Sequence, residues 1–239
     1  MNVAIILASG TGDRMGKKVP KQFLTVYDKP IIIYTLEGFQ HNESIDKIIC
    51  VCLSGWEQVL KAYCEQFNIN KLVDIIPGGK IGQESIYNGL VSAKQHVTDE
   101  DLVIIHDGVR PMVNNEVLNN VIEIANEEGN AVTSTRVTDQ IQVATTENSS
   151  KGYYKRDGLR KVTTPQAYRF KFIMNAYEKA LKTGVGFSSS AYANTMLLDQ
   201  GETLNFAEGS DKNLKLTTVE DLDIFKSLLK TERAEWIKE

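Results

Sequence analysis

The sequence VAIILASGTGDRMG at residues 3–16 decides the fold class. Its first six residues form an apolar run of strand length, and its last eight contain three glycines. Such a run is typical of a buried strand, and the backbone amides of a glycine-rich turn can approach and surround phosphate oxygens. This junction therefore predicts a strand that ends in an anion-binding loop.

Two common phosphate-binding motifs do not fit this loop. A dinucleotide fingerprint needs glycine where the chain has Met15, and a P-loop needs four residues between its glycines, whereas five separate Gly10 from Gly16. What remains is a loop that carries two cations, Arg14 and Lys21. On these residues alone a plain surface turn with solvated charges is the alternative interpretation.

Apolar runs alternate with longer amphipathic stretches through the first 136 residues. We expect strands at 3–8, 46–53, 73–76, 102–106 and 131–136. We expect helices at 31–40, 57–67, 83–94 and 116–127. This alternation predicts an α/β fold, a mostly parallel sheet with helices on both faces. Ligands of such sheets bind beyond the carboxyl ends of the strands, so we look to the loops after Ala8, Ile76 and His106.

The pattern changes between residues 140 and 162, where polar and apolar residues alternate without a helical period. This stretch predicts an antiparallel hairpin arm, assigned to residues 137–163, that projects from a single domain of residues 1–239. An arm of this length is marginal alone, so we expect it to pack on a second subunit. Beyond it we expect helices at 171–182, 192–199 and 219–230 and a strand at 203–207.

The composition excludes several classes of protein. The 239 residues carry a formal charge of only −4, which gives no general attraction to nucleic acid or anionic lipid. We find neither an apolar run of about 18 residues nor a signal peptide, so no membrane partner is expected. We expect Cys50, Cys52 and Cys64 to be buried free thiols, which is typical of the cytoplasm. Any anionic ligand must then be held by a local basic cluster.

Five motifs follow one another along the chain. They are the glycine-rich loop with PKQ at 20–22, GG at 78–79 with Ser85, HDGVRP at 106–111, Arg156 with TPQ at 164–166, and NLKLTT at 213–218 with EDL at 220–222. Together they resemble the family of cytidylyltransferases that act on methylerythritol phosphate and ribitol phosphate. The resemblance covers almost the whole chain. It implies a Rossmann-like sheet, a homodimer formed through the arm at 137–163, and a requirement for Mg²⁺.

The resemblance also implies a reaction, in which a phosphate oxygen of a polyol phosphate attacks the α-phosphorus of CTP and expels pyrophosphate. Both reactants are anions, so the enzyme must place positive charge beforehand. The implied catalytic cations are Arg14, Lys21 and Lys215. The implied nucleotide contacts are Ala8, Ser9, Gly10, Thr11, Gly12, Gly79, Ser85 and Asp107. The implied acceptor contacts are Arg156 from the second subunit's arm, Gln140 and Asp107.

Asp107 is also the expected Mg²⁺ ligand, because this hard cation prefers oxygen ligands. Without the resemblance, a helix or turn cap is the alternative role for this carboxylate. For Arg110 a structural ion pair is at least as good an interpretation as a substrate contact.

The acceptor side departs from the family pattern. Asp139 is followed by Gln140, where the family usually has threonine. The methylerythritol enzymes carry Thr-Asp-Glu-Ala further on, and the ribitol enzymes a similar Asp-Ala step, whereas residues 188–194 read SSSAYAN. Because unpaired buried polar groups are costly, such changes predict a different alcohol or a relaxed selection among alcohols. The leading class is a cell-wall or capsule polyol phosphate, such as ribitol, glycerol or another alditol phosphate. Methylerythritol phosphate of isoprenoid synthesis is the runner-up, and a non-catalytic nucleotide-binding protein is the alternative of another class.

Overall fold

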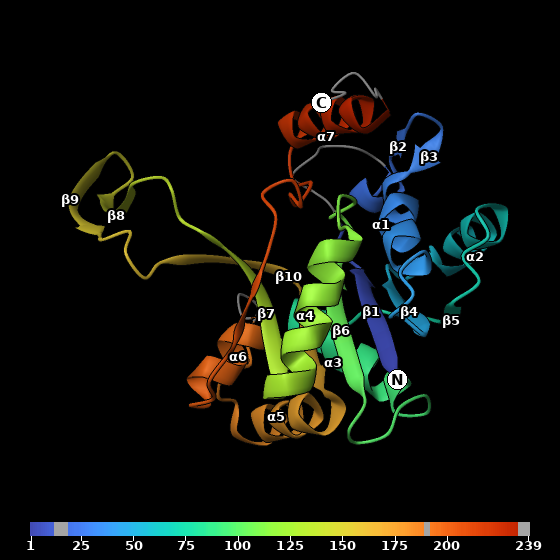
Figure 1. Cartoon of the computed structure of the whole chain (residues 1–239), viewed down its shortest axis with the longest axis horizontal. Helices are drawn as coiled ribbons and strands as arrows, with labels where there is room; N and C mark the ends of the chain where they lie inside the picture. Colours follow the sequence, from blue (N-terminus) through green and yellow to red (C-terminus); the bar gives the residue numbers. More distant parts are fainter. Residues whose placement is uncertain (12–18, 189–191, 234–239) are drawn as a thin grey trace.

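The computed structural model describes residues 1–11, 19–188 and 192–233 (Figure 1). Seven strands form its main sheet, in the order β11-β7-β10-β6-β1-β4-β5. Their bounds are β1 Asn2–Ala8, β4 Lys47–Cys52, β5 Leu72–Pro77, β6 Leu102–Asp107, β7 Asn130–Arg136, β10 Arg160–Arg169 and β11 Phe206–Glu208. Every strand of this sheet is parallel to the others except β10, which runs antiparallel to β6 and β7. The predicted mostly parallel sheet is confirmed.

β1 lies inside the sheet, between β4 and β6, and pairs in parallel with both. Its side chains alternate between two cores, with Ala4 and Ile6 in one and Val3 and Ile5 in the other. The chain continues from β1 to β4 on one side and returns to β6 on the other. This change of direction is the switch point at which open parallel sheets hold their ligands, so the residues after β1 and β6 are well placed for a site.

Helices cover both faces of the sheet, as predicted (Figure 1). The first core contains residues of α1 Ile31–Gln40, α2 Glu57–Gln66 and α4 Asn115–Glu128. The second contains residues of α3 Gly82–Ala93, α5 Phe170–Thr183 and α6 Ala193–Asp199. The last helix, α7 Val219–Arg233, packs on α1 through Phe225, whose ring meets Tyr34 edge-on at a centroid distance of 5.2 Å. Within the described ranges, none of the helices is long and apolar enough to cross a bilayer.

The three cysteines are buried free thiols, as predicted. Cys50 and Cys52 share one face of β4 and lie in the same core as Cys64 of α2. Burial raises the pKa of Cys52 and of Cys64 to about 12. These thiols are therefore protonated packing groups at neutral pH.

A hairpin of β8 Ile141–Thr146 and β9 Ser149–Tyr154 projects from the body (Figure 1). It lies where the arm was expected, and all its residues are exposed. The end of the expected arm, residues 137–163, differs from the prediction. β10 already begins at Arg160 and pairs there with Arg136 of β7, so residues 160–163 belong to the main sheet. Two differences are smaller. The short strands β2 Thr25–Val26 and β3 Lys29–Pro30, which follow the 3-10 turn η2 Lys21–Phe23, were not expected. The strand expected at 203–207 is β11, which runs over Phe206–Glu208.

Candidate active site

A cavity of about 420 Å³ opens at the carboxyl ends of β1 and β6. The loop after β1 lines it from Ser9 to Thr11, the loop after β5 from Gly79 to Gly82, and Asp107 lines it at the end of β6. These are the three loops to which the strand order pointed. The cavity therefore lies where the sequence predicted a ligand site.

Three lysines from distant parts of the sequence line this cavity: Lys21, Lys80 and Lys215. Lys21 lies in η2, and Lys215 precedes α7. The structure thus brings two of the predicted catalytic cations to one hollow. The third, Arg14, lies outside the described residues, as does Gly12. Lys80 was not predicted, and its only signal in the sequence was its position next to the two glycines of the loop after β5.

Asp107 is held between two cations. Lys215 Nζ lies 2.9 Å from one carboxylate oxygen, and Arg110 Nε lies 2.8 Å from the other. Burial by itself would raise the pKa of Asp107, but Lys215 and Arg110 outweigh it and lower the pKa to about 2. Arg110 also donates from Nη1 to the carbonyl oxygen of Asn213 at 2.9 Å. Arg110 therefore forms the expected ion pair and ties the end of β6 to the chain near Lys215.

A buried chain of hydrogen bonds fixes the backbone of Asp107 from behind. Burial lowers the pKa of His106 to about 4, so its ring is neutral. The carbonyl of Arg110, 3.2 Å from Nε2, can only accept, so Nε2 carries the proton and Nδ1 accepts from the Thr164 hydroxyl at 3.1 Å. The same Thr164 oxygen accepts from the Asp107 amide at 3.1 Å. The contacts of Thr164 with His106 and with the Asp107 amide therefore fix the backbone that carries the Asp107 carboxylate.

Gln22 fixes the start of the glycine-rich loop. Its side chain is 1% exposed, and Nε2 donates to the carbonyls of Ala8 at 2.7 Å and of Gly10 at 3.0 Å. The sequence showed Gln22 only as part of a motif and assigned it no role. The structure indicates that it shapes the loop from inside the protein.

Ser85 joins the loop after β1 to the loop after β5. Its hydroxyl oxygen accepts from the Ser9 hydroxyl and from the Gly79 amide, each at 3.0 Å. A Cβ on Gly79 would lie 2.2 Å from the Cβ of Glu84, so only glycine fits there. Three predicted nucleotide contacts, Ser9, Gly79 and Ser85, therefore form one wall of the cavity.

The two predicted acceptor contacts of the arm lie elsewhere in this chain. Gln140 and Arg156 are exposed, and Arg156 donates from Nη1 to the carbonyl of Thr138 at 2.6 Å. Neither lines the cavity. Arg156 was expected to act from the arm of a second subunit, and the roles of both residues stay predictions.

The cavity offers limited support for a metal. Asp107 is the one acidic side chain among its described lining residues, and the described part of the chain holds no group of three His, Cys, Asp or Glu residues suited to a metal ion. Mg²⁺ in nucleotide enzymes often takes one or two carboxylates and completes its shell with phosphate oxygens and water. This donor set fits an ion that arrives with the triphosphate, with Asp107 as its protein ligand.

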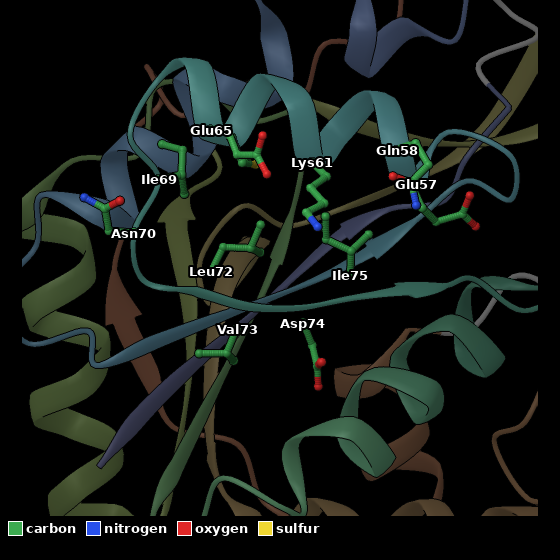
Figure 2. Close-up of a pocket in the computed structure, with 11 residues that line it drawn as sticks. Glu57, Gln58, Lys61, Glu65, Ile69, Asn70, Leu72, Val73, Asp74 and Ile75 are labelled. Atoms are coloured by element: carbon green, nitrogen blue, oxygen red, sulfur yellow. The ribbon is translucent and has the colours of Figure 1, made fainter.

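A second hollow, of about 440 Å³, lies between α2 and β5 at the edge of the sheet (Figure 2). Its charged lining residues are Glu57, Glu65 and Asp74, with Lys61 as the one cation among those described. Three carboxylates beside one ammonium repel a triphosphate. The cavity with the three lysines is therefore the candidate active site.

The family model described as 2-C-methyl-D-erythritol 4-phosphate cytidylyltransferase, IspD, matches residues 2–231. The chain belongs to the IspD family. The predicted resemblance and the nucleotidyltransferase class are confirmed.

Curated members of this family are similar along nearly their whole length. A ribitol-5-phosphate cytidylyltransferase of Lacticaseibacillus paracasei is 46% identical, over 96% of this chain and 98% of its own. A second, from Vibrio parahaemolyticus, is 35% identical over 97% of each. A 2-C-methyl-D-erythritol 4-phosphate cytidylyltransferase of Clostridium botulinum is 36% identical, over 95% and 97%. These relatives are named as enzymes, which gives no support to the alternative of a non-catalytic binding protein.

Solved structures of IspD-family proteins share the fold. A 4-diphosphocytidyl-2C-methyl-D-erythritol synthase of Anaerococcus prevotii is 24% identical with a TM-score of 0.80, covering 96% of each chain. A cytidylyltransferase of Thermus thermophilus is 23% identical with a TM-score of 0.75, covering 96% of this chain and all of that one. At this identity the likeness shows the fold alone.

Proposed function

We propose that this protein transfers CMP from CTP to ribitol 5-phosphate and releases pyrophosphate. The observation that carries the proposal is the convergence of Lys21 and Lys215 with Asp107 in one cavity. The choice of ribitol is supported by the ribitol-5-phosphate cytidylyltransferase that is 46% identical over nearly the whole chain. The product would serve the synthesis of a cell-wall or capsule polymer.

The chemistry needs positioned charge more than a reactive side chain. A phosphate oxygen of the acceptor forms a new bond to the α-phosphorus of CTP, while the bond from that phosphorus to the bridging oxygen breaks. The bridging oxygen leaves with the electron pair as part of pyrophosphate. The acceptor phosphate is largely a dianion at pH 7, because the second pKa of such groups is about 6, so no general base is required. Lys21 and Lys215 stabilise the negative charge that develops around the α-phosphate.

Asp107 keeps Lys215 ready for this step. In the structure the carboxylate accepts from Lys215, so the ammonium lies in the cavity before any substrate binds. When the triphosphate arrives, Lys215 can turn toward it, while Arg110 keeps the carboxylate in place from the other oxygen. The Asp107 oxygen that Lys215 leaves can then accept a hydrogen bond from a hydroxyl of the polyol phosphate, or bind Mg²⁺. A magnesium ion held there would neutralise charge on the phosphates.

A second copy of the chain completes the proposed site. The hairpin exposes Ile141, Val143, Tyr153 and Tyr154, which favours contact with another protein surface. In a homodimer formed through this arm, Arg156 would bind the acceptor phosphate, and Gln140 would face the polyol. The three thiols fit a cytoplasmic location, which is part of the proposal.

Pyrophosphate release tests the proposal directly. Purified protein is mixed with CTP, Mg²⁺ and, in turn, ribitol 5-phosphate, glycerol 3-phosphate and methylerythritol 4-phosphate. We expect the highest kcat/KM with ribitol 5-phosphate. A preference for methylerythritol 4-phosphate, the substrate in the family model's description, would refute the acceptor and leave the enzyme class intact. Turnover with none of the three would refute the proposed reaction.

A further inference from the structure

Tyr192 is an exposed aromatic residue in the candidate active site. It lines the cavity, and 56% of its surface is exposed. In the sequence this tyrosine stands out only as part of the SSSAYAN departure from the family pattern. In the structure its ring centroid lies 5.7 Å from Lys215 Nζ. This distance is within the range in which an ammonium is attracted to the face of an aromatic ring.

The backbone of Tyr192 is well anchored although its ring is exposed. Its amide donates to Thr195 Oγ1 at 2.8 Å, and its carbonyl accepts from the amide of Met196 at 3.0 Å at the start of α6. The fully buried Gln83 of α3 also donates to that carbonyl, from Nε2 at 3.3 Å. These contacts fix the backbone from which the ring extends toward Lys215.

An aromatic ring can position the ammonium of Lys215 without neutralising its charge. Lysine is a point charge on a flexible four-carbon stem with three hydrogen-bond donors. A second carboxylate beside it would neutralise its charge and occupy one of those donors. An aromatic face attracts the cation by its quadrupole and does neither. No aspartate or glutamate occurs between residues 187 and 196, so the sequence of this segment keeps the charge of Lys215 available.

We propose that Tyr192 is a positioning residue for Lys215, which holds the ammonium in the cavity as it passes from Asp107 to the α-phosphate. This role rests on the proposed cytidylyl transfer. Tyr192 does not itself touch the reacting atoms, so its loss should lower kcat and leave the KM for CTP little changed.

Three variants test this role. Tyr192→Leu keeps an apolar side chain and removes the ring, so kcat should fall about three- to tenfold, the size expected of one cation–π contact. Tyr192→Phe keeps the face and should restore most of that loss. Leu198→Ala is the matched control, because Leu198 is 54% exposed on α6, the helix that begins directly after Tyr192, and does not line the cavity. It should behave as the unaltered protein.

A double-mutant cycle shows whether the effect passes through Lys215. In a Lys215→Ala background, Tyr192→Leu should cost nothing further, measured as pyrophosphate release at high enzyme concentration. An undiminished loss in that background would overturn the proposal. So would a Tyr192→Leu variant with normal kcat, or one in which only the acceptor KM rises.

A second readout does not depend on turnover. After reductive ¹³C-methylation of the lysines, the Lys215 signal is assigned by its absence in Lys215→Arg. It should shift in Tyr192→Leu, because the ring current is lost, and stay in place in Tyr192→Phe. If the protein acts on no polyol phosphate, the proposed function fails, yet this shift still decides whether Tyr192 holds Lys215. An unmoved signal in Tyr192→Leu would overturn the inference.

Discussion

Replacing Asp107 by asparagine should cost stability in a way that depends on pH. Its carboxylate lies between Arg110 and Lys215 at 2.8 and 2.9 Å, and its side chain is only 14% exposed. These cations lower its pKa from 3.8 to about 2. At about 1.4 kcal/mol for each pH unit, this corresponds to roughly 2–3 kcal/mol of folding free energy, as an order of magnitude. Asp107→Asn should lose about this amount at pH 7.

The sign of the pH dependence follows from the direction of the pKa change. A carboxylate with a lowered pKa in the folded state stabilises the protein fully above its unfolded pKa, near 4, and loses this effect as the pH falls toward 2. Urea unfolding followed by circular dichroism at pH 7, 5, 4 and 3 measures it. The difference between the unaltered protein and Asp107→Asn should be constant from pH 7 to about 5 and shrink below 4.

A matched control separates this effect from the loss of any ion pair. Asp99 lies 2.9 Å from Lys171, the same distance as Asp107 from Lys215, but both side chains are more than half exposed. Asp99→Asn should change stability little, because exposed pairs are screened by water and salt. Equal stability losses in the two variants, or a loss in Asp107→Asn that grows as the pH falls, would refute the reasoning.

Three further predictions concern activity. Lys21→Ala and Lys215→Ala should each lower kcat about 10²- to 10³-fold in the pyrophosphate assay, because each removes positioned charge near the α-phosphate; a normal kcat in either would contradict its role. Arg156→Ala should mainly raise the KM for the acceptor. If each site uses both chains, mixed dimers of Arg156→Ala and Lys215→Ala subunits should regain some activity, because one of their two sites keeps both residues. Mixed dimers that regain no activity would contradict the shared site. Gly79→Ala should raise the KM for CTP and leave the acceptor KM unchanged, because its Cβ would displace Glu84 and the loop that carries the nucleotide wall; an unchanged KM for CTP would contradict that position.

Much of the fold was predictable because its signals are local. The run at 3–8 is apolar at every position, and β1 is buried between two strands. Pro30 pre-sets the start of α1, which runs over Ile31–Gln40 as predicted. The loops that line the cavity could be located because ligands of parallel sheets gather beyond the carboxyl ends of the strands.

The position of β10 inside the sheet could not be predicted from local signals. Its residues include Pro165 and several polar side chains, and its register shifts between Val162 and Gln166. A proline removes a ladder donor and argues against an inner strand, yet this strand lies between β6 and β7. Only tertiary pairing shows its place, and only then is it clear that Thr164 supports Asp107.

The contacts of Tyr192 and Arg110 were beyond the sequence for a different reason. The sequence left Arg110 open between an ion pair and a substrate contact, and only the folded structure shows its ion pair with Asp107. Tyr192 meets Lys215 across 22 intervening positions of the chain, and no spacing rule links them. Side-chain contacts between separate loops depend on the folded backbone.

The course of β10 has a consequence for how such chains can vary in length during evolution. In its inner part Ala167 packs into one core and Tyr168 into the other, so one inserted residue there would exchange the two faces. At the tip of the hairpin, between Thr146 and Ser149, every residue is exposed and an insertion would disturb no core. Related chains should therefore gain and lose residues at the tip and keep the strand behind it constant in length.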